Sequence, residues 1–247
     1  MARVSTAAAV GGRAVLVALL APGTIPARPA PALAAPSPAS EVRTTPAARA
    51  SAGGGLVDVG ALLPDVRVEL KYATDDNFLG RNVYGELRAC RLVGDAAEKL
   101  VRARSLLRER APDLTLVLYD CGRPRHVQVE MWRLVAGTPK EPYVANPHVP
   151  PGSVHNTGCA VDLSLARLAS GEALDMGTPF DFFGPLAEPQ QEIAFWQKGE
   201  LSSEQLANRL LLREVMLRAG FRVRPNEWWH FDCADPERAR ELYPTIE

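Results

Sequence analysis

The chain has 247 residues, which is enough for one folded domain of ordinary size. Hydrophobic residues make up 47% and charged residues 23%, a composition that is typical of globular proteins and excludes a largely disordered chain. The formal net charge is −1 and no long Lys/Arg stripe is present, so we expect neither nucleic acid nor an anionic membrane surface as a partner.

The first 34 residues have the features of a secretory signal peptide. Arg3 and Arg13 supply positive charge, and the apolar run Ala14–Ala21 is far shorter than the ~18–20 residues of a membrane-spanning helix. Ala32-Leu33-Ala34 fits a cleavage site of the small-x-small kind. We therefore expect residues 1–34 to be removed on export to the periplasm, the cell envelope or the medium, leaving no transmembrane segment. The alternative is an unprocessed Ala/Pro-rich tail.

Residues 35–55 are rich in Ala, Pro, Ser, Thr and Gly, which predicts a flexible linker, and the folded domain is expected over residues 56–247. The domain contains four cysteines: Cys90, Cys121, Cys159 and Cys233. Export would permit disulfides, and four cysteines allow three complete pairings that sequence does not distinguish. One option, a Cys121–Cys159 pair, would brace two segments that carry candidate site residues. No CxxC spacing is present, so a structural cysteine–zinc site is not expected.

The first half of the domain is expected to alternate strands and helices. Period-two apolar residues over 66–72 predict a half-buried strand, and a further short strand is expected over 87–93. Asp95 is expected to begin a helix, with Glu98 completing a capping box. The run Leu114–Tyr119 is strongly β-prone and predicts a strand.

In the second half, Gly158 is expected at a turn or a close approach, before a strand over 159–165 in which Asp162 faces away from the apolar side. Ser202 and Gln205 predict the capped start of a long helix. Residues 221–232 predict two strands joined at Pro225-Asn226. The pattern indicates an α+β single domain with an antiparallel central sheet flanked by helices.

Three side chains on these elements suit a metal ion: His155, Asp162 and His230. A buried, unpaired carboxylate costs several kcal/mol, so Asp162 on an otherwise apolar strand needs a cation or hydrogen-bond donors. Two imidazoles and one carboxylate match a catalytic zinc site, which takes three protein ligands and leaves one position open. The alternative is an Asp–His hydrogen-bonded pair without metal.

Glu227 precedes His230 by three residues. Residues three apart on a strand face opposite ways, so Glu227 reaches the same centre only if it lies in the turn before the strand. There it would act as a general base. The alternative is a surface glutamate in a hairpin.

The motifs SVHNTGCAVD (153–162) and EWWH (227–230) resemble those of the VanX-type D-alanyl-D-alanine dipeptidases, zinc D,D-peptidases that share a fold with the hedgehog signalling domain. The similarity extends to KYATDDNFLG (71–80), the GRP of YDCGRP (119–124) and MGTPFDFF (176–183). It implies one zinc ion per chain, a small D-amino-acid dipeptide or a wall-derived peptide as substrate, and a role in cell-wall peptide metabolism.

The resemblance assigns a role to seven residues. They are His155, Asp162 and His230 as zinc ligands, Glu227 as base, Arg123 as the oxyanion-stabilising group, and Ser153 and Asp181 as partners of the substrate ammonium. An acid at Asp181 would favour dipeptides over longer chains, although Asp181 could equally cap a helix. A peptidoglycan D,D- or L,D-carboxypeptidase and a non-catalytic zinc-bearing module are the alternative functions. One departure is Gly122, where relatives often carry Tyr, a change that could widen the pocket.

Overall fold

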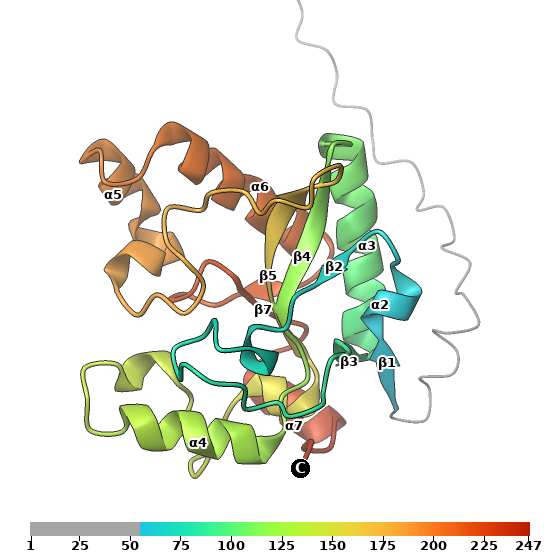
Figure 1. Cartoon of the computed structure of the whole chain (residues 1–247), viewed down its shortest axis with the longest axis vertical. Coiled ribbons are helices and arrows are strands. Elements are labelled where there is room, and N and C mark those ends of the chain that lie inside the picture. Colours follow the sequence, from blue (N-terminus) through green and yellow to red (C-terminus); the bar gives the residue numbers. More distant parts are fainter. Residues whose placement is uncertain (1–54) are drawn as a thin grey trace, which may run out of the picture. The chain divides into compact units, whose positions relative to one another are not determined.

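The computed structural model describes residues 55–247, and Figure 1 shows their arrangement. The predicted signal peptide 1–34 and nearly all of the predicted linker 35–55 lie outside the described residues. The domain predicted from residue 56 begins with strand β1 (Leu56–Asp58). Among the described residues, no helix has both the length and the apolar character needed to cross a membrane.

The central sheet has five strands in the order β2-β4-β5-β7-β6. Their bounds are β2 Arg67–Val68, β4 Leu114–Asp120, β5 Ala160–Arg167, β7 His230–Asp232 and β6 Arg222–Val223. β2 runs parallel to β4, whereas the other three pairs are antiparallel. The prediction of an antiparallel central sheet is therefore right for β4, β5, β7 and β6 and wrong for edge strand β2. The chain leaves β2 and returns to β4 through a helix, and such a crossover joins parallel strands.

The first predicted strands are shorter than the periodicity indicates. β2 ends at Val68, and the chain turns into a 3-10 helix, η2 (Lys71–Ala73), which removes Tyr72 from the predicted strand. Only the end of the predicted strand 87–93 is extended, as β3 (Arg91–Val93), and it pairs with β1 in a separate two-stranded sheet. Period-two patterns also arise where an irregular segment lies on the core, as residues 69–73 do.

Two long helices cover one face of the central sheet: α3 (Gly94–Arg110) and α6 (Ser203–Arg218) (Figure 1). Their apolar side chains form one buried cluster with alternate residues of β5. The members include Leu100, Leu107, Val161, Leu163, Leu165, Leu212 and Met216. Ser202 and Gln205 form the predicted capping box at the start of α6. The capping box predicted at Asp95 is wrong, because α3 already begins at Gly94 and has no side-chain cap.

The remaining helices are shorter than these two. They are α2 (Val59–Leu62), α4 (Arg125–Val135), α5 (Glu192–Gln197), α7 (Pro236–Leu242) and the 3-10 helices η3 (Glu141–Tyr143), η4 (Val154–Thr157), η5 (Pro185–Ala187) and η6 (Pro189–Gln191). Gly158 ends η4 with a φ of 74°, and a Cβ there would lie 2.8 Å from Leu56 Cδ2. Both parts of the prediction for Gly158 are thus confirmed.

A β-bulge in β4 decides which side chains share the face of Asp162. Leu118 lies opposite Leu163, but Asp120 lies opposite Asp162, so Tyr119 is an extra residue on β4. Strict alternation would have sent Asp120 to the same side as Leu118, into the apolar core. The bulge instead places the Asp120 carboxylate beside Asp162, and re-aiming a side chain in this way is a known use of bulges near active sites.

Candidate metal centre and catalytic site

The three predicted ligands, His155, Asp162 and His230, converge on one point. His155 Nε2 lies 3.2 Å from Asp162 Oδ1 and 3.1 Å from His230 Nδ1. His230 Nδ1 lies 2.9 Å from the same Asp162 oxygen. Ligand atoms around a tetrahedral zinc ion with bonds of ~2.0–2.1 Å are separated by roughly 3.3 Å. The three atoms are thus spaced almost as a bound ion would hold them.

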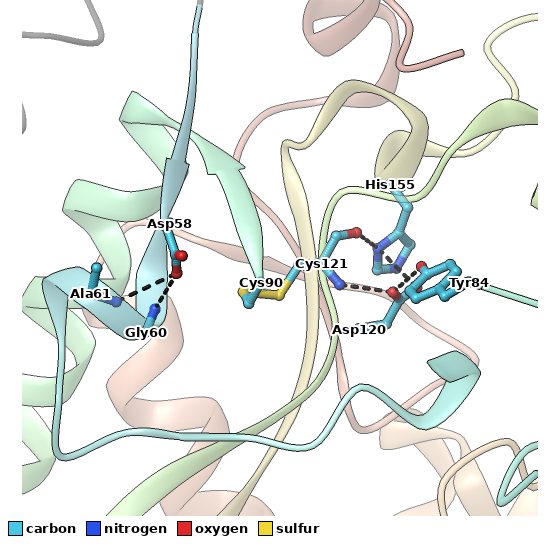
Figure 2. Close-up of a disulfide and its surroundings, with 8 residues drawn as sticks. All are labelled: Asp58, Gly60, Ala61, Tyr84, Cys90, Asp120, Cys121 and His155. Atoms are coloured by element: carbon cyan, nitrogen blue, oxygen red, sulfur yellow. Dashed lines mark hydrogen bonds and ion pairs between the residues drawn. A yellow bond between two sulfur atoms is a disulfide. The ribbon is translucent and has the colours of Figure 1, made fainter. Parts of the chain in front are cut away.

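The His155 ring is fixed by a backbone carbonyl. His155 Nδ1 donates to Cys121 O at 2.7 Å, the contact drawn in Figure 2. A carbonyl can only accept, so the proton is on Nδ1 and the lone pair of Nε2 is directed at the centre. The Asp120 carboxylate lies beside the same Nδ1, at 3.5 Å.

The His230 ring is fixed in the opposite sense. His230 Nε2 donates to Asp232 Oδ1 at 2.8 Å, which leaves Nδ1 as the ligand atom. His230 and Asp232 are two residues apart on β7 and therefore lie on the same face of the strand. A hydrogen bond from the outer ring nitrogen to a carbonyl or a carboxylate is the usual support for a metal-binding histidine. His155 makes this bond to a carbonyl and His230 makes it to a carboxylate.

The electrostatics of the centre favour a positive charge. Burial acts to lower the pKa of His230, but the carboxylates of Asp232 and Asp162 outweigh it and raise that pKa to about 10. Burial acts to raise the pKa of Asp162, but the neighbouring imidazoles of His155 and His230 hold it far below its ordinary range. The buried carboxylates thus stabilise positive charge at the point where a metal cation would bind. The donor set and its charge both fit a divalent ion.

Glu227 lies next to this centre, in the turn before β7, as the spacing predicts. Its Oε2 is 3.6 Å from His230 Nδ1 and 3.7 Å from Arg224 Nε. The side chain is buried, which excludes the alternative of a surface glutamate in a hairpin. Burial raises the pKa of Glu227, so the carboxylate is a stronger base than a solvated one.

Arg123 follows β4 and is buried beside the same cavity. Its Nε and Nη2 both donate to Asp120 Oδ2, at 2.9 and 2.6 Å, and its Nη1 donates to Gln128 Oε1 at 2.6 Å. Burial acts to lower the pKa of Arg123, but the charge of Asp120 outweighs it and keeps the guanidinium cationic. These bonds use three of its five N–H groups, and two remain for a ligand.

Asp181 lines the same cavity and lies in an irregular loop. Its carboxylate accepts hydrogen bonds from Tyr72 Oη at 2.8 Å and from Phe78 N at 3.3 Å. It caps no helix, so that alternative is wrong. Its φ of 61° is unusual for a residue with a side chain and marks a strained position. Although the residue is partly exposed, packing around the carboxylate raises its pKa to about 8.

Ser153, Asp181, Arg123, Glu227 and the ligands all line one cavity that is open to solvent. The other lining residues are Tyr72, Phe78, Gln128, Met131, Tyr143, Val144, Ala145, Phe183, Arg224 and Trp229. Ser153 is buried just ahead of η4. The structure therefore brings all seven predicted site residues together.

Gly122 does not widen this cavity, contrary to the expectation. It does not line the cavity, and its N donates to Arg91 O at 2.9 Å. A Cβ at Gly122 would lie 2.7 Å from Arg91 O and 2.9 Å from Ile246 Cδ1. The missing side chain makes room for β3 and for the end of the chain. Its absence has no direct effect on the substrate space.

Two disulfides hold the segments that carry the site. Cys90–Cys121 joins the segment before β3 to the end of β4, next to the carbonyl that orients His155 (Figure 2). Cys159–Cys233 joins the residue before β5 to the residue after β7. The pairing of Cys121 with Cys159 considered from the sequence is thus wrong.

The end of the chain also reaches the site. Ile246 N donates to Asn156 O at 2.7 Å, and Arg125 N donates to Ile246 O at 2.8 Å. Asn156 is the neighbour of His155, and its Nδ2 donates to Arg123 O at 2.8 Å. One backbone segment thus connects the turn that carries a ligand with the turn that carries the guanidinium.

Sequence reasoning missed several residues that support the site. Asp232 could have been found from its period-two relation to His230. Asp120 holds Arg123 and accepts a hydrogen bond from Tyr84 Oη (Figure 2), but a bulge invisible in the sequence brings it there. Tyr72 was assigned to a strand, and its contact with Asp181 spans 109 residues.

Comparison with known proteins agrees with this geometry. The model of peptidase family M15, described as D-ala-D-ala dipeptidase, matches residues 52–245. The D-alanyl-D-alanine dipeptidase of Escherichia coli (strain K12) is 37% identical over 191 residues, which cover 77% of this chain and 89% of that protein. Proteins of the same name from Enterococcus faecium and Streptomyces coelicolor are each 32% identical, covering 77% and 72% of this chain and 95% and 91% of their own length. A match over essentially the whole described domain shows that this chain belongs to the D-Ala-D-Ala dipeptidase family of M15 peptidases.

Proposed function

We propose that this protein is a zinc-dependent hydrolase of the D-Ala-D-Ala dipeptide. The observation that carries the proposal is the meeting of His155 Nε2, His230 Nδ1 and Asp162 Oδ1 within 3.2 Å of one another, with Glu227 beside them. Family membership and the names of the relatives supply the substrate. Zinc is the preferred ion because two imidazoles and one carboxylate form a common catalytic zinc set.

A zinc ion held by His155, Asp162 and His230 would supply a Lewis acid that polarises the peptide carbonyl and acidifies water. The protein's own groups then do the remaining work. Glu227, made more basic by burial, takes a proton from the attacking water and passes it to the departing amine. Arg123 has two N–H groups to donate to the oxyanion that develops on the carbonyl. Asp120 and Gln128 hold that guanidinium in place.

Asp181 would bind the free ammonium of the substrate, with Ser153 as a neutral partner. Tyr72 Oη and Phe78 N fix the carboxylate, so it does not swing towards solvent. A peptide extended at its amino end would bring no ammonium to this point and would leave a charge unpaired. The need for a free ammonium at Asp181 favours a dipeptide over the longer stems that a carboxypeptidase trims.

A non-catalytic zinc-bearing module is the other alternative. Glu227 and Arg123 lie within 3.6 and 3.8 Å of ligand side chains, at His230 Nδ1 and Asp162 Oδ2, but neither makes a hydrogen bond to them. The hydrogen bonds that support the ligands come from Cys121 O and Asp232. Burial raises the pKa of Glu227, which suits a general base and gives no advantage in holding a metal ion. The hydrolase is therefore the better account of the cavity.

The test is an amine-release assay on D-Ala-D-Ala, its N-acetylated form and the tripeptide D-Ala-D-Ala-D-Ala, with and without a chelator. We expect release from the free dipeptide alone, and loss of that activity in chelator with recovery on adding zinc. Equal cleavage of the acetylated dipeptide would favour a carboxypeptidase. If the zinc-loaded protein cleaves none of these peptides, the non-catalytic zinc-bearing module becomes the better explanation.

We also propose that the domain works outside the cytoplasm, on a free dipeptide or on wall-derived peptides. The signal-like residues 1–34 and the two disulfides, Cys90–Cys121 and Cys159–Cys233, support export, because such bonds persist in oxidising compartments. Expression of the full chain in a bacterial host should give an extracytoplasmic product whose N-terminus, by mass spectrometry, lies after the leader. An intact, cytoplasmic product would contradict this.

A further inference from the structure

We propose that Arg224 binds the C-terminal carboxylate of the substrate and so makes the enzyme selective for a free carboxyl end. The proposal rests on the proposed dipeptidase function and adds a residue to it. A free dipeptide carries an ammonium at one end and a carboxylate at the other. Asp181 accounts for the ammonium, but the cavity must also hold the carboxylate, next to the buried acids Asp162 and Glu227. A carboxylate in such surroundings needs a cation.

Apart from its two histidines, the cavity has two basic lining residues within 55–247, Arg123 and Arg224. Arg123 already donates two hydrogen bonds to Asp120 and one to Gln128, and its two remaining N–H groups are those proposed for the oxyanion. The Arg224 side chain is 25% exposed, and its Nε donates to Asn226 Oδ1 at 3.0 Å. Among the described residues its two terminal amino groups donate to no protein acceptor. Four N–H groups of a planar fork are thus left for a ligand.

The fork is held rigidly enough to act as a binding group. Arg224 directly follows β6, and its backbone N donates to His230 O at 3.2 Å, which ties it to the strand that carries a metal ligand. The hydrogen bond to Asn226 restrains the guanidinium plane. A guanidinium in a fixed plane matches the two oxygens of a carboxylate, and less side-chain entropy is lost on binding.

Arg224 also lies at the correct end of the substrate. Its Nε is 3.7 Å from Glu227 Oε2, and Glu227 gives its proton to the departing amine. That amine belongs to the C-terminal residue, and the carboxylate is joined to the same α-carbon. The ammonium end lies elsewhere: Asp181 accepts from Tyr72, whose ring lies 5.0 Å from the Arg123 guanidinium. Asp181 and Arg224 line the same cavity from different segments, and together they would bind the two charged ends of a dipeptide.

The competing explanation is that Arg224 acts only on Glu227, by lowering the pKa that burial raises. Loss of such an effect would slow every substrate equally. A carboxylate-binding role instead depends on what the C-terminus of the substrate carries. D-Ala-D-Ala and its C-terminal amide have the same scissile bond, so the ratio of their kcat/KM values separates the two explanations.

The experiment measures that ratio in the zinc-loaded wild type and in Arg224→Gln. Arg222→Gln is the matched control, because Arg222 lies two residues earlier, is 64% exposed and does not line the cavity. A hydrogen-bonded charge pair corresponds to roughly 10- to 100-fold in affinity. We expect Arg224→Gln to raise KM for the free dipeptide by about that factor while sparing the amide, and Arg224→Lys to keep part of the selectivity. Equal losses on both substrates, or no loss, would overturn the proposal.

A binding measurement separates this inference from the function on which it rests. In the Glu227→Gln background, calorimetry compares binding of D-Ala-D-Ala and its amide with and without Arg224→Gln. A preference for the free acid that disappears with Arg224 supports the inference even if the wild type turns over no dipeptide. If the wild type turns over the dipeptide but the acid and the amide bind equally well, the inference about Arg224 is wrong and the proposed function is unaffected.

Discussion

At the scale of single residues, the centre depends on atoms that never touch the ion. Cys121 O and the Asp232 carboxylate accept hydrogen bonds from the outer nitrogens of His155 and His230, and so decide which ring nitrogen is available as a ligand. Asp120 does the same for Arg123. The reactive side chains are therefore oriented before any ligand arrives, and the energetic cost of ordering them has been met by folding.

Glu227→Gln should retain zinc and lose more than ~100-fold in kcat, the usual scale for loss of a general base. The amide fills the same space but cannot take a proton. Zinc content by atomic absorption and kcat on D-Ala-D-Ala give the two readouts, with the exposed Glu200→Gln as control. Full activity in Glu227→Gln would remove this residue from the mechanism.

Asp232→Ala should weaken zinc binding by roughly 10- to 100-fold, the range seen when the outer partner of a ligand histidine is lost. His230 would then lack the acceptor that fixes its proton on Nε2. Competition with a chromophoric chelator measures the affinity, and the exposed Asp113→Ala serves as control. Unchanged affinity in Asp232→Ala would show that the tautomer is set by something else.

The activity should fall as the pH drops below about 8. In the free enzyme burial raises the pKa of Asp181 to about 8, so below that pH the carboxyl is neutral and binds an ammonium poorly. kcat/KM reports ionisations of the free enzyme, and it should therefore rise with pH up to that value. Above it the substrate amine, with a pKa near ~8, loses its own charge.

Asp181→Asn is the control for this profile. The variant should have a low kcat/KM that no longer rises between pH 6 and 8. A wild-type profile that is flat over this range, or an equal slope in the variant, would show that another group controls substrate binding.

At the scale of elements, two cross-links and one bulge bring the site together. The Cys159–Cys233 bond closes a separation of 74 residues and lies one residue from the ends of β5 and β7, the strands that carry Asp162 and His230. The bulge at Tyr119 brings Asp120 to the same face. The positions of the ligands relative to one another are thus set by strand pairing and by a covalent bond together.

Replacing Cys159 and Cys233 together by Ser should therefore destabilise the domain and weaken zinc binding. The chain-entropy relation gives an upper estimate of about 4.5 kcal/mol for a loop of this length. Denaturant unfolding and zinc titration measure the two effects. Cys90→Ser with Cys121→Ser should cost similar stability but affect the centre only through His155. Zinc affinity unchanged in the first pair would refute a positioning role.

The difference between local and non-local information explains which parts of this fold were predictable. The cap at Ser202, the strand that carries Asp162 and the turn that carries Glu227 depend on neighbours within a few residues, and all three are confirmed. The parallel edge strand β2, the bulge at Tyr119 and the disulfide pairing depend on contacts between distant segments. The periodicity of the sequence does not encode such long-range contacts. The site residues were identified as one set from the resemblance to a family, which local propensity could not provide.

At the scale of the whole molecule, the ion should be a structural partner as well as a catalytic one. Its ligands come from η4, β5 and β7, so binding to the folded state alone stabilises the connections between these elements. A ligand present at 100 times its Kd contributes about 2.7 kcal/mol.

Removing zinc by dialysis against chelator should therefore lower Tm by about 5–10 °C, because a domain of this size shifts by ~2–4 °C per kcal/mol. Differential scanning calorimetry with and without added zinc measures the change. His155→Ala should show no response to zinc. Identical Tm values for the metal-loaded and stripped wild type would mean that the ion adds nothing to the fold.

The contacts of Ile246 have a practical consequence for anyone handling this enzyme. Its backbone joins Asn156 to Arg125, so Ile246 contacts the neighbour of the proposed metal ligand His155 and a residue two positions from Arg123, the arginine proposed for the oxyanion. Clipping the last two residues with a carboxypeptidase, or attaching a purification handle directly behind Glu247, would disturb turnover from outside the cavity. Handles are better placed ahead of residue 55, and a preparation with a trimmed end should be suspected when specific activity drifts during storage.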